Sequence, residues 1–200
     1  GGDDVYSGNK RDVAVLYEYW LFFKLLEIVE EVFKIEPKSL EELIKETDDG
    51  LGLQLKQGTY MPVKGIYDAG TRKLNIEFSY NRTFSGENKY PDSGSWTKSM
   101  RPDYTLSIWP HGINSENAER EELITHIHFD AKYKVENILG IVGSEDDFKN
   151  EKEDQRKGTY KRVDLLKMHS YKDAIRRTAG SYILYPGTDS PYTKIGFHEL

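Results

Sequence analysis

The hydrophobic and polar residues of the segment THIHFDAKYKV, residues 125 to 135, alternate strictly. Because side chains in a strand repeat every two residues, this alternation predicts a β-strand with two chemically opposite faces. One face is polar and consists of His126, His128, Asp130, Lys132 and Lys134. An antiparallel strand with one solvated face would explain the pattern without any chemistry.

Helical spacing marks the beginning of the chain. Residues 12 to 33 carry apolar side chains all round, then turn acidic, which predicts a long helix buried at its N-terminal half, with Asp12 as its N-cap. Pro37 ends this segment. Ser39 followed by Glu42 is a capping-box pattern and predicts a short second helix. The chain is therefore expected to begin with a helical hairpin.

The rest of the chain favours a sheet flanked by helices. Strands are predicted around residues 53–57, 73–80, 103–109, 125–135 and 181–185. The segment DAGTR is typical of a hairpin turn, the polar segment 111–122 predicts a loop, and residues 161–177 have helical periodicity. We expect an α/β fold of the α+β type, with a central mixed sheet and each long helix covering one of its faces.

Composition narrows the class of protein. Its 200 residues suit a single domain, which we assign to residues 1–200, and the opening GGDD suggests a piece of a longer chain that lacks its N-terminal region. A net charge of -6 excludes nucleic-acid binding by bulk charge, so any DNA contact must be local. The absence of cysteine and of any apolar run long enough for a membrane predicts a cytoplasmic protein without membrane contact.

Two aspartates are candidates for a shared site. Asp103 begins one predicted strand and Asp130 lies late in the next, so a hairpin can bring their carboxylates together. Adjacent carboxylates repel each other unless they share a proton or a cation, and oxygen-rich sites of this kind suit Mg²⁺. Lys132 lies on the same face as Asp130, where an ammonium can orient a metal-bound water and offset charge on a phosphate.

A third carboxylate stands in an unusual place. Glu18 shares a helical stripe with Phe22, Leu25 and Val29, and burying a carboxylate there is costly unless a cation meets it. A lysine or arginine partner, or a side chain that reaches out to solvent, would explain this position equally well.

Several motifs together resemble a known family. RPD and DAK resemble the signature of the PD-(D/E)xK nuclease superfamily. The fuller set, LYEYWLFFKL, MRPDYTL, HFDAKYK, KMHSYKDAIR and YILYPG, spans residues 13 to 187 and resembles the nuclease domain of McrC-type restriction subunits.

This resemblance implies a restriction-endonuclease-like core and a Mg²⁺-dependent or Mn²⁺-dependent DNA endonuclease of an anti-phage restriction system. It implies an AAA+ GTPase or ATPase partner like McrB, and a homodimer for double-strand cleavage. By motif position, Asp103, Asp130 and the Ala131 carbonyl would bind metal and Lys132 would act on the attacking water. Glu18 would be an outer or direct ligand.

The helix after the core supplies further candidates. The resemblance implies an auxiliary polar residue there, for which His169 and Tyr171 are the candidates. The residues expected to hold DNA phosphates are Arg101, Lys134, Lys172, Arg176 and, beside it, Arg177. Basic residues near a helix end also complement its macrodipole, and a surface histidine is often only solvated.

Two other functions stay open. His126, His128 and Asp130 form a ladder that could ligate Zn²⁺ or Fe²⁺ through imidazole. A nuclease-like fold could also serve as a non-catalytic DNA-binding or assembly module. Metal-dependent nicking separates the nuclease from both alternatives.

Overall fold

The computed structural model of the protein describes residues 2–34, 44–46, 53–55, 61–132 and 159–185. Its elements are α1 (Gly2–Phe33), β1 (Ile44–Glu46), β2 (Leu53–Leu55), β3 (Met61–Asp68), β4 (Lys73–Tyr80), β5 (Tyr104–Pro110), α2 (Ser115–Arg120), β6 (Thr125–Ala131), α5 (Thr159–Ala174) and β7 (Thr178–Leu184).

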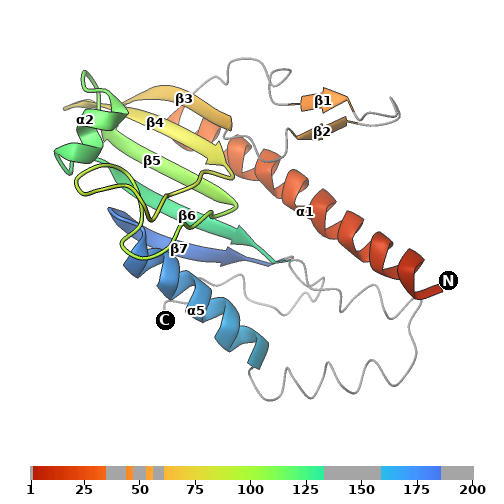
Figure 1. Ribbon diagram of the computed structural model, residues 1–200. Helices are drawn as coiled ribbons and strands as arrows, with labels where there is room; N and C mark the ends of the chain where they lie inside the picture. The colour runs from red at the N-terminus through yellow and green to blue at the C-terminus, as the bar shows by residue number, and fades with distance from the viewer. Residues whose placement is uncertain (1, 35–43, 47–52, 56–60, 133–158, 186–200) are drawn as a thin grey trace, which may run out of the picture.

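A five-stranded mixed sheet in the order β3-β4-β5-β6-β7 forms the centre of the fold (Figure 1). The first four strands pair antiparallel, and β7 joins β6 in parallel. A parallel neighbour needs a crossover connection, and α5 lies in the connection between β6 and β7. This mixed sheet with flanking helices confirms the predicted α+β, restriction-endonuclease-like fold.

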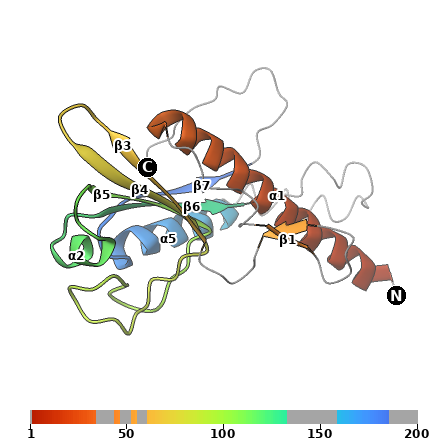
Figure 2. The same ribbon diagram turned by 90° about the horizontal axis from the view of Figure 1, so that it is seen from above.

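Helix α1 covers one face of the sheet (Figure 2). Phe22 is fully buried, and its ring stacks on Phe78 with 5.6 Å between centroids. The sheet side of this core comes from alternate positions of β4 and β5, including Ile76, Tyr80 and Leu106. The alternation in these strands therefore directs one apolar face toward α1.

Helix α5 lies on the opposite face (Figure 2). A second cluster of buried apolar side chains joins this helix to the segment between β4 and β5: Phe84, Met100, Met168, Tyr171, Ala174 and Ile175. Each long helix therefore covers one sheet face, as predicted.

The polar face of β6 is buried, so the alternative of a strand with one solvated face does not hold. His126, His128 and Asp130 are each 0% exposed. A strand has a wet face only when nothing covers it. Here Phe84 of the β4–β5 connection packs against both imidazoles, and Ser107 of β5 and Lys167 of α5 supply polar partners. The strand ends at Ala131, and the predicted residues 133–135 lie outside the described part of the chain.

The N-terminal prediction is wrong in detail. Helix α1 begins at Gly2, so Asp12 is an interior residue and not the N-cap. Ile44–Glu46, expected in a second helix, pairs with Leu53–Leu55 as a strand, because pairing with a later segment outweighs a local capping signal. Residues 39–43 lie outside the described part.

Two elements were not predicted. Strand β3 forms a hairpin with β4 around the expected DAGTR turn, where Gly70 adopts a φ of 81°. The polar segment 111–122 contains the short helix α2, capped by the Asn114 side chain, which accepts a hydrogen bond from the Asn117 N–H. Within the described residues, no helix is long and apolar enough to cross a membrane.

Candidate active site

The antiparallel pairing of β5 with β6 brings Asp103 and Asp130 together. Tyr104 lies opposite Phe129, so Asp103, one residue earlier, faces Asp130, one residue later. The Ala131 N–H donates a hydrogen bond to Asp103 Oδ2 at 2.7 Å. The prediction that the strands of the two aspartates are neighbours is confirmed, and a direct hydrogen bond joins their two motifs.

Two lysines surround the carboxylate of Asp130. Lys167 Nζ donates a hydrogen bond to Asp130 Oδ1 at 2.6 Å, and Lys132 Nζ forms an ion pair with Oδ2 at 3.0 Å. Asp130 itself is 0% exposed. A buried carboxylate is tolerated only when opposite charge and hydrogen bonds compensate for lost hydration, and these ammonium groups supply both.

Lys167 is the residue that sequence reasoning missed. It lies on α5, four residues before the buried Tyr171, and residues four apart share a helix face. Its ammonium lies 5.4 Å from the centre of the Tyr171 ring. The four-residue spacing between Lys167 and Tyr171 was the feature of the sequence that could have identified Lys167 as a site residue.

The pKa of Asp103 reflects its crowded surroundings. Burial, and next the negative charge of Asp130, raise the pKa of Asp103 to about 7, although the Ala131 N–H opposes this change. In a pair of carboxylates, each charge raises the cost of ionising the other. The pair therefore favours a proton or a cation between its members.

Glu18 reaches the same region from α1. The Tyr104 hydroxyl donates a hydrogen bond to the Glu18 backbone carbonyl at 2.6 Å, and the Tyr80 hydroxyl lies 3.4 Å from Oε2. Burial raises the pKa of Glu18, the Tyr80 hydroxyl lowers it, and the charge of Asp130 raises it again. Glu18 therefore shares an electrostatic environment with Asp130, although Glu18 lies on helix α1 and Asp130 on strand β6.

The donor set fits a hard divalent cation. Within the described residues, Asp130 Oδ2 is buried without a hydrogen-bond partner, its contact with Lys132 being an ion pair only. Carboxylate and carbonyl oxygens are the ligands such cations prefer. As the side chains stand, no three histidine or acidic residues of the described chain are grouped closely enough to hold an ion. The ammonium groups hold positive charge at the place where a cation would supply it.

The two auxiliary candidates lie on different faces of α5. Tyr171 is buried, and its hydroxyl donates a hydrogen bond to the Arg101 carbonyl at 3.3 Å. Burial, and next the charges of Asp130 and Asp103, raise the pKa of Tyr171. His169 is exposed, and two residues' separation on a helix turns it away from Tyr171 and Lys167. The structure thus places Tyr171, and not His169, next to the aspartates.

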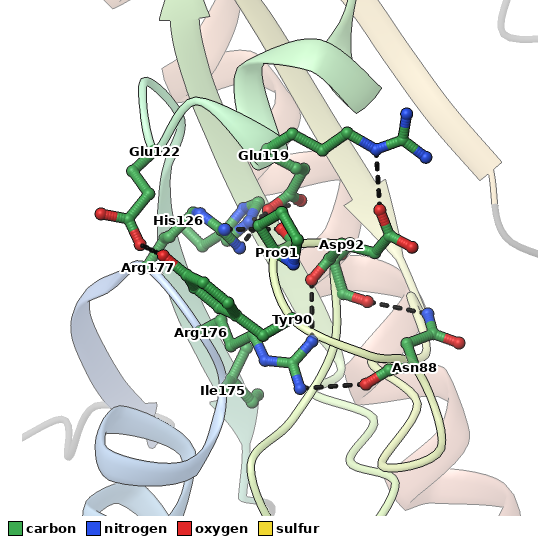
Figure 3. A network of polar contacts seen from close by, with 12 residues as sticks. Asn88, Tyr90, Pro91, Asp92, Glu119, Glu122, His126, Ile175, Arg176 and Arg177 are labelled. Atoms are coloured by element: carbon green, nitrogen blue, oxygen red, sulfur yellow. Dashed lines mark hydrogen bonds and ion pairs between the residues drawn. The ribbon is translucent and has the colours of Figure 1, made fainter.

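The candidate phosphate contacts also separate. Arg101 and Lys172 are exposed, and Lys134 lies outside the described residues. Arg176 is buried, and its guanidinium donates hydrogen bonds to the carbonyls of Asp92 at 2.8 Å and Asn88 at 3.0 Å (Figure 3). This arrangement anchors the β4–β5 connection and leaves Arg176 unsuited to the predicted phosphate contact.

Arg177 is also turned inward. Its guanidinium forms an ion pair with Glu119 Oε2 at 3.1 Å and donates to the Pro91 carbonyl at 2.7 Å. Glu119 is in turn adjacent to His126 (Figure 3). Arg177 therefore belongs to a buried polar network with Glu119 and His126.

The histidine ladder is fully engaged by protein partners. The two ring nitrogens of His126 contact Ser107 Oγ at 2.8 Å and Glu119 Oε1 at 3.1 Å. Those of His128 contact Thr105 Oγ1 and Thr178 Oγ1, both at 3.0 Å. Burial lowers the pKa of His128 to about 2. These contacts leave no ring nitrogen for Zn²⁺ or Fe²⁺ and disfavour that alternative.

Comparison with known proteins agrees with this geometry. Residues 15–190 match the family model described as PD-(D/E)XK nuclease superfamily. No curated protein and no solved structure matches the chain. The matched region includes Glu18, Asp103, Asp130, Lys132 and Lys167. With most of its length covered by that one model, the chain belongs to the PD-(D/E)XK nuclease superfamily.

Proposed function

We propose that this protein is a Mg²⁺-dependent DNA endonuclease domain of a McrC-like restriction subunit, with Asp103, Asp130 and Lys132 at its active site. The hydrogen bond from the Ala131 N–H to Asp103 Oδ2 carries the proposal, because it joins the two halves of the family signature. Superfamily membership supports nuclease activity.

The acidic residues are proposed to hold the metal. PD-(D/E)XK nucleases typically use divalent metal ions. Asp103, Asp130 and the Ala131 carbonyl would hold the ion, with Glu18 as an outer or direct ligand. When bound, a divalent cation lowers the pKa of water and stabilises negative charge on a phosphoryl oxygen. Mg²⁺ is the proposed ion because the donors are oxygens, and Mn²⁺ is expected to substitute for it.

Lys132 is proposed to act on the attacking water and on the phosphate. Its ammonium is held 3.0 Å from Asp130 Oδ2, and its backbone N–H donates to the Leu184 carbonyl at 2.9 Å. The backbone contact fixes the base of the side chain at the end of the sheet. An ammonium positioned in this way can orient water and offset the charge that develops during phosphodiester hydrolysis.

Tyr171 is proposed as the auxiliary residue, for the buried position described above. His169 is exposed, so it could serve as an auxiliary residue only by contacting the substrate directly. Arg101, Lys172 and Lys134 are proposed to contact the DNA backbone. The net charge of -6 requires that such contacts be local.

The biological setting is proposed from the McrC-like motifs. The domain would act in the cytoplasm in restriction of invading DNA, recruited by an AAA+ GTPase or ATPase of the McrB type. Two copies would cleave the two strands. The whole of residues 1–200 would form this one domain.

Plasmid nicking tests the chemistry. The wild-type domain is expected to nick supercoiled DNA in Mg²⁺ or Mn²⁺ and to be inactive in EDTA. Asp103→Asn, Asp130→Asn and Lys132→Met should each abolish nicking, while the exposed Asp68→Asn serves as the matched control. Wild-type nicking by a folded Asp130→Asn variant would overturn the assignment.

Metal binding is measured on the same proteins by calorimetry, because a motor partner can control turnover. The wild type should bind Mn²⁺ and Asp130→Asn should not. DNA binding that needs no metal, together with neither nicking nor metal binding, would favour the non-catalytic alternative.

A further inference from the structure

The carboxylate of Asp130 has a cationic group at each oxygen. Lys167 occupies Oδ1 from α5, and Lys132 approaches Oδ2 from the end of β6. A cation shared by Asp103 and Asp130 would need room at these oxygens. Two ammonium groups and a divalent ion on one carboxylate would also repel one another strongly.

We propose that Lys167 is the resident counter-ion of Asp130 in the metal-free protein, and that a divalent cation displaces its ammonium from Oδ1. This inference rests on the metal site of the proposed function. It goes beyond that function by assigning a role to a lysine outside the family signature.

The need for a counter-ion follows from burial. Asp130 is 0% exposed, and a buried charge without compensation costs several kcal/mol. Asp103 adds a second carboxylate opposite it, so the empty site would hold repelling charges. A short hydrogen bond from Lys167 stabilises the site until a divalent ion takes over that task.

Lys167 is better placed to leave than Lys132. The Lys132 backbone N–H is fixed by the Leu184 carbonyl, and its side chain is 32% exposed. Lys167 reaches Asp130 from a helix on the sheet surface, and its side chain is 39% exposed, so its ammonium can move into water without passing through the core. Its ammonium already lies over the adjacent Tyr171 ring, a cation–π contact that does not depend on Asp130.

The displacement makes a sign-specific prediction about metal affinity. A divalent ion that binds at Oδ1 breaks the Lys167–Asp130 hydrogen bond, so removing the ammonium removes a competitor and tightens binding. Hydrogen bonds to charged groups contribute enough that the expected gain is about tenfold or more. By linkage, the same substitution should destabilise the metal-free protein much more than the metal-saturated protein.

The test uses Lys167→Met and Lys167→Gln, with Lys24→Met as the matched control, because Lys24 is an exposed lysine of α1 that pairs with a carboxylate, Glu27, outside the site. Calorimetry gives the Mn²⁺ and Mg²⁺ dissociation constants, and thermal unfolding gives the melting temperature with and without each ion. Both Lys167 variants should bind metal more tightly than wild type. Their melting temperature should fall without metal and recover at saturation, while Lys24→Met matches wild type.

Four outcomes would contradict the inference or the proposed function. Wild-type or weaker metal affinity in both variants, or an equal loss of melting temperature with and without metal, would make Lys167 a strut and overturn the inference alone. Variants that stay unfolded even at saturating Mn²⁺ would do the same. No metal binding by wild type or variants would overturn the proposed function as well. Variants that are unfolded alone but fold on addition of Mn²⁺ would support displacement.

Discussion

The Tyr104 hydroxyl donates a hydrogen bond to the backbone carbonyl of Glu18 at 2.6 Å, across 86 positions of sequence. Tyr104 immediately follows Asp103 in the chain and is fully buried. This hydrogen bond therefore ties the Glu18 backbone of α1 directly to the residue next to Asp103, in addition to the apolar packing of the helix.

Removing this hydroxyl should affect both the fold and the site. Tyr104→Phe is expected to lower the free energy of unfolding by about 1 kcal/mol, the usual contribution of one buried hydrogen bond. It should also weaken Mn²⁺ binding, because the Glu18 backbone loses its tether. Denaturant unfolding and calorimetry measure the two effects. Tyr67→Phe, a partly buried tyrosine packed on α1, is the control. Unchanged metal affinity in Tyr104→Phe would show that this hydrogen bond does not contribute to the metal site.

Glu18→Gln tests whether α1 contributes a metal ligand. Burial and the charge of Asp130 both raise the pKa of Glu18, so its carboxylate is unfavourable in the empty site. We expect the metal-free melting temperature to stay the same or rise, and metal affinity and cleavage to fall. Glu31→Gln, exposed on the same helix, should change none of these. A sharp loss of metal-free stability with normal metal binding and cleavage would identify Glu18 as a structural strut.

The buried imidazole of His128 should make the folded protein less stable in acid. Burial lowers the pKa of its imidazole to about 2, below the ordinary histidine value of 6.5. Below about pH 6.5 the unfolded chain therefore binds a proton at His128 that the folded protein does not bind. The contribution of this histidine to stability is fully present above about pH 6.5 and is lost as the pH decreases. The slope for this one group is about 1.4 kcal/mol per pH unit.

Unfolding free energies between pH 7.5 and 5 measure this slope. His128→Asn should reduce it by up to one proton's contribution, whatever the variant's absolute stability. His169→Asn, exposed on α5, is the control and should keep the wild-type slope. An unchanged slope in His128→Asn would show that the imidazole is not held neutral.

Replacing Arg82 should cause a large loss of stability. Its guanidinium pairs with Glu119 Oε1 at 3.1 Å and donates to Ser107 Oγ at 3.0 Å, and Glu119 is buried. Arg82→Met should cost about 3–5 kcal/mol, because it removes one partner from a buried ionic network.

Arg120→Met provides the comparison for Arg82→Met. Arg120 pairs with Asp92 at 2.8 Å, but both side chains are exposed. This variant should cost far less than Arg82→Met, because water screens an exposed ion pair. Denaturant unfolding of both variants tests the contrast, and similar losses would mean that the Arg82 network is solvated.

Much of the fold was predictable because its strands alternate clearly. The segment 125–135 indicates both a strand and which residues share a face, and the order of Asp103 and Asp130 indicates a hairpin. Which face is solvated was not predictable. Burial of His126 and His128 depends on α5 and on the β4–β5 connection, both remote in sequence.

The site was predictable to the extent that its residues lie in a motif. Asp103, Asp130 and Lys132 lie at the adjoining ends of β5 and β6 and carry the family signature. Lys167 does not, and a lysine on a helix is ordinarily a solvated residue. Only the packing of α5 against the sheet brings its ammonium to Asp130.

The buried polar face of β6 also determines how the strand can align during folding. A slip of one residue would exchange its two faces. Ile127 and Phe129 would then meet Glu119 and Ser107, and the two histidines would enter the aromatic core beside Phe22 without partners. Such an alignment is strongly penalised, so the imidazoles that contact Ser107 and Thr105 protect the one register in which Asp103 faces Asp130.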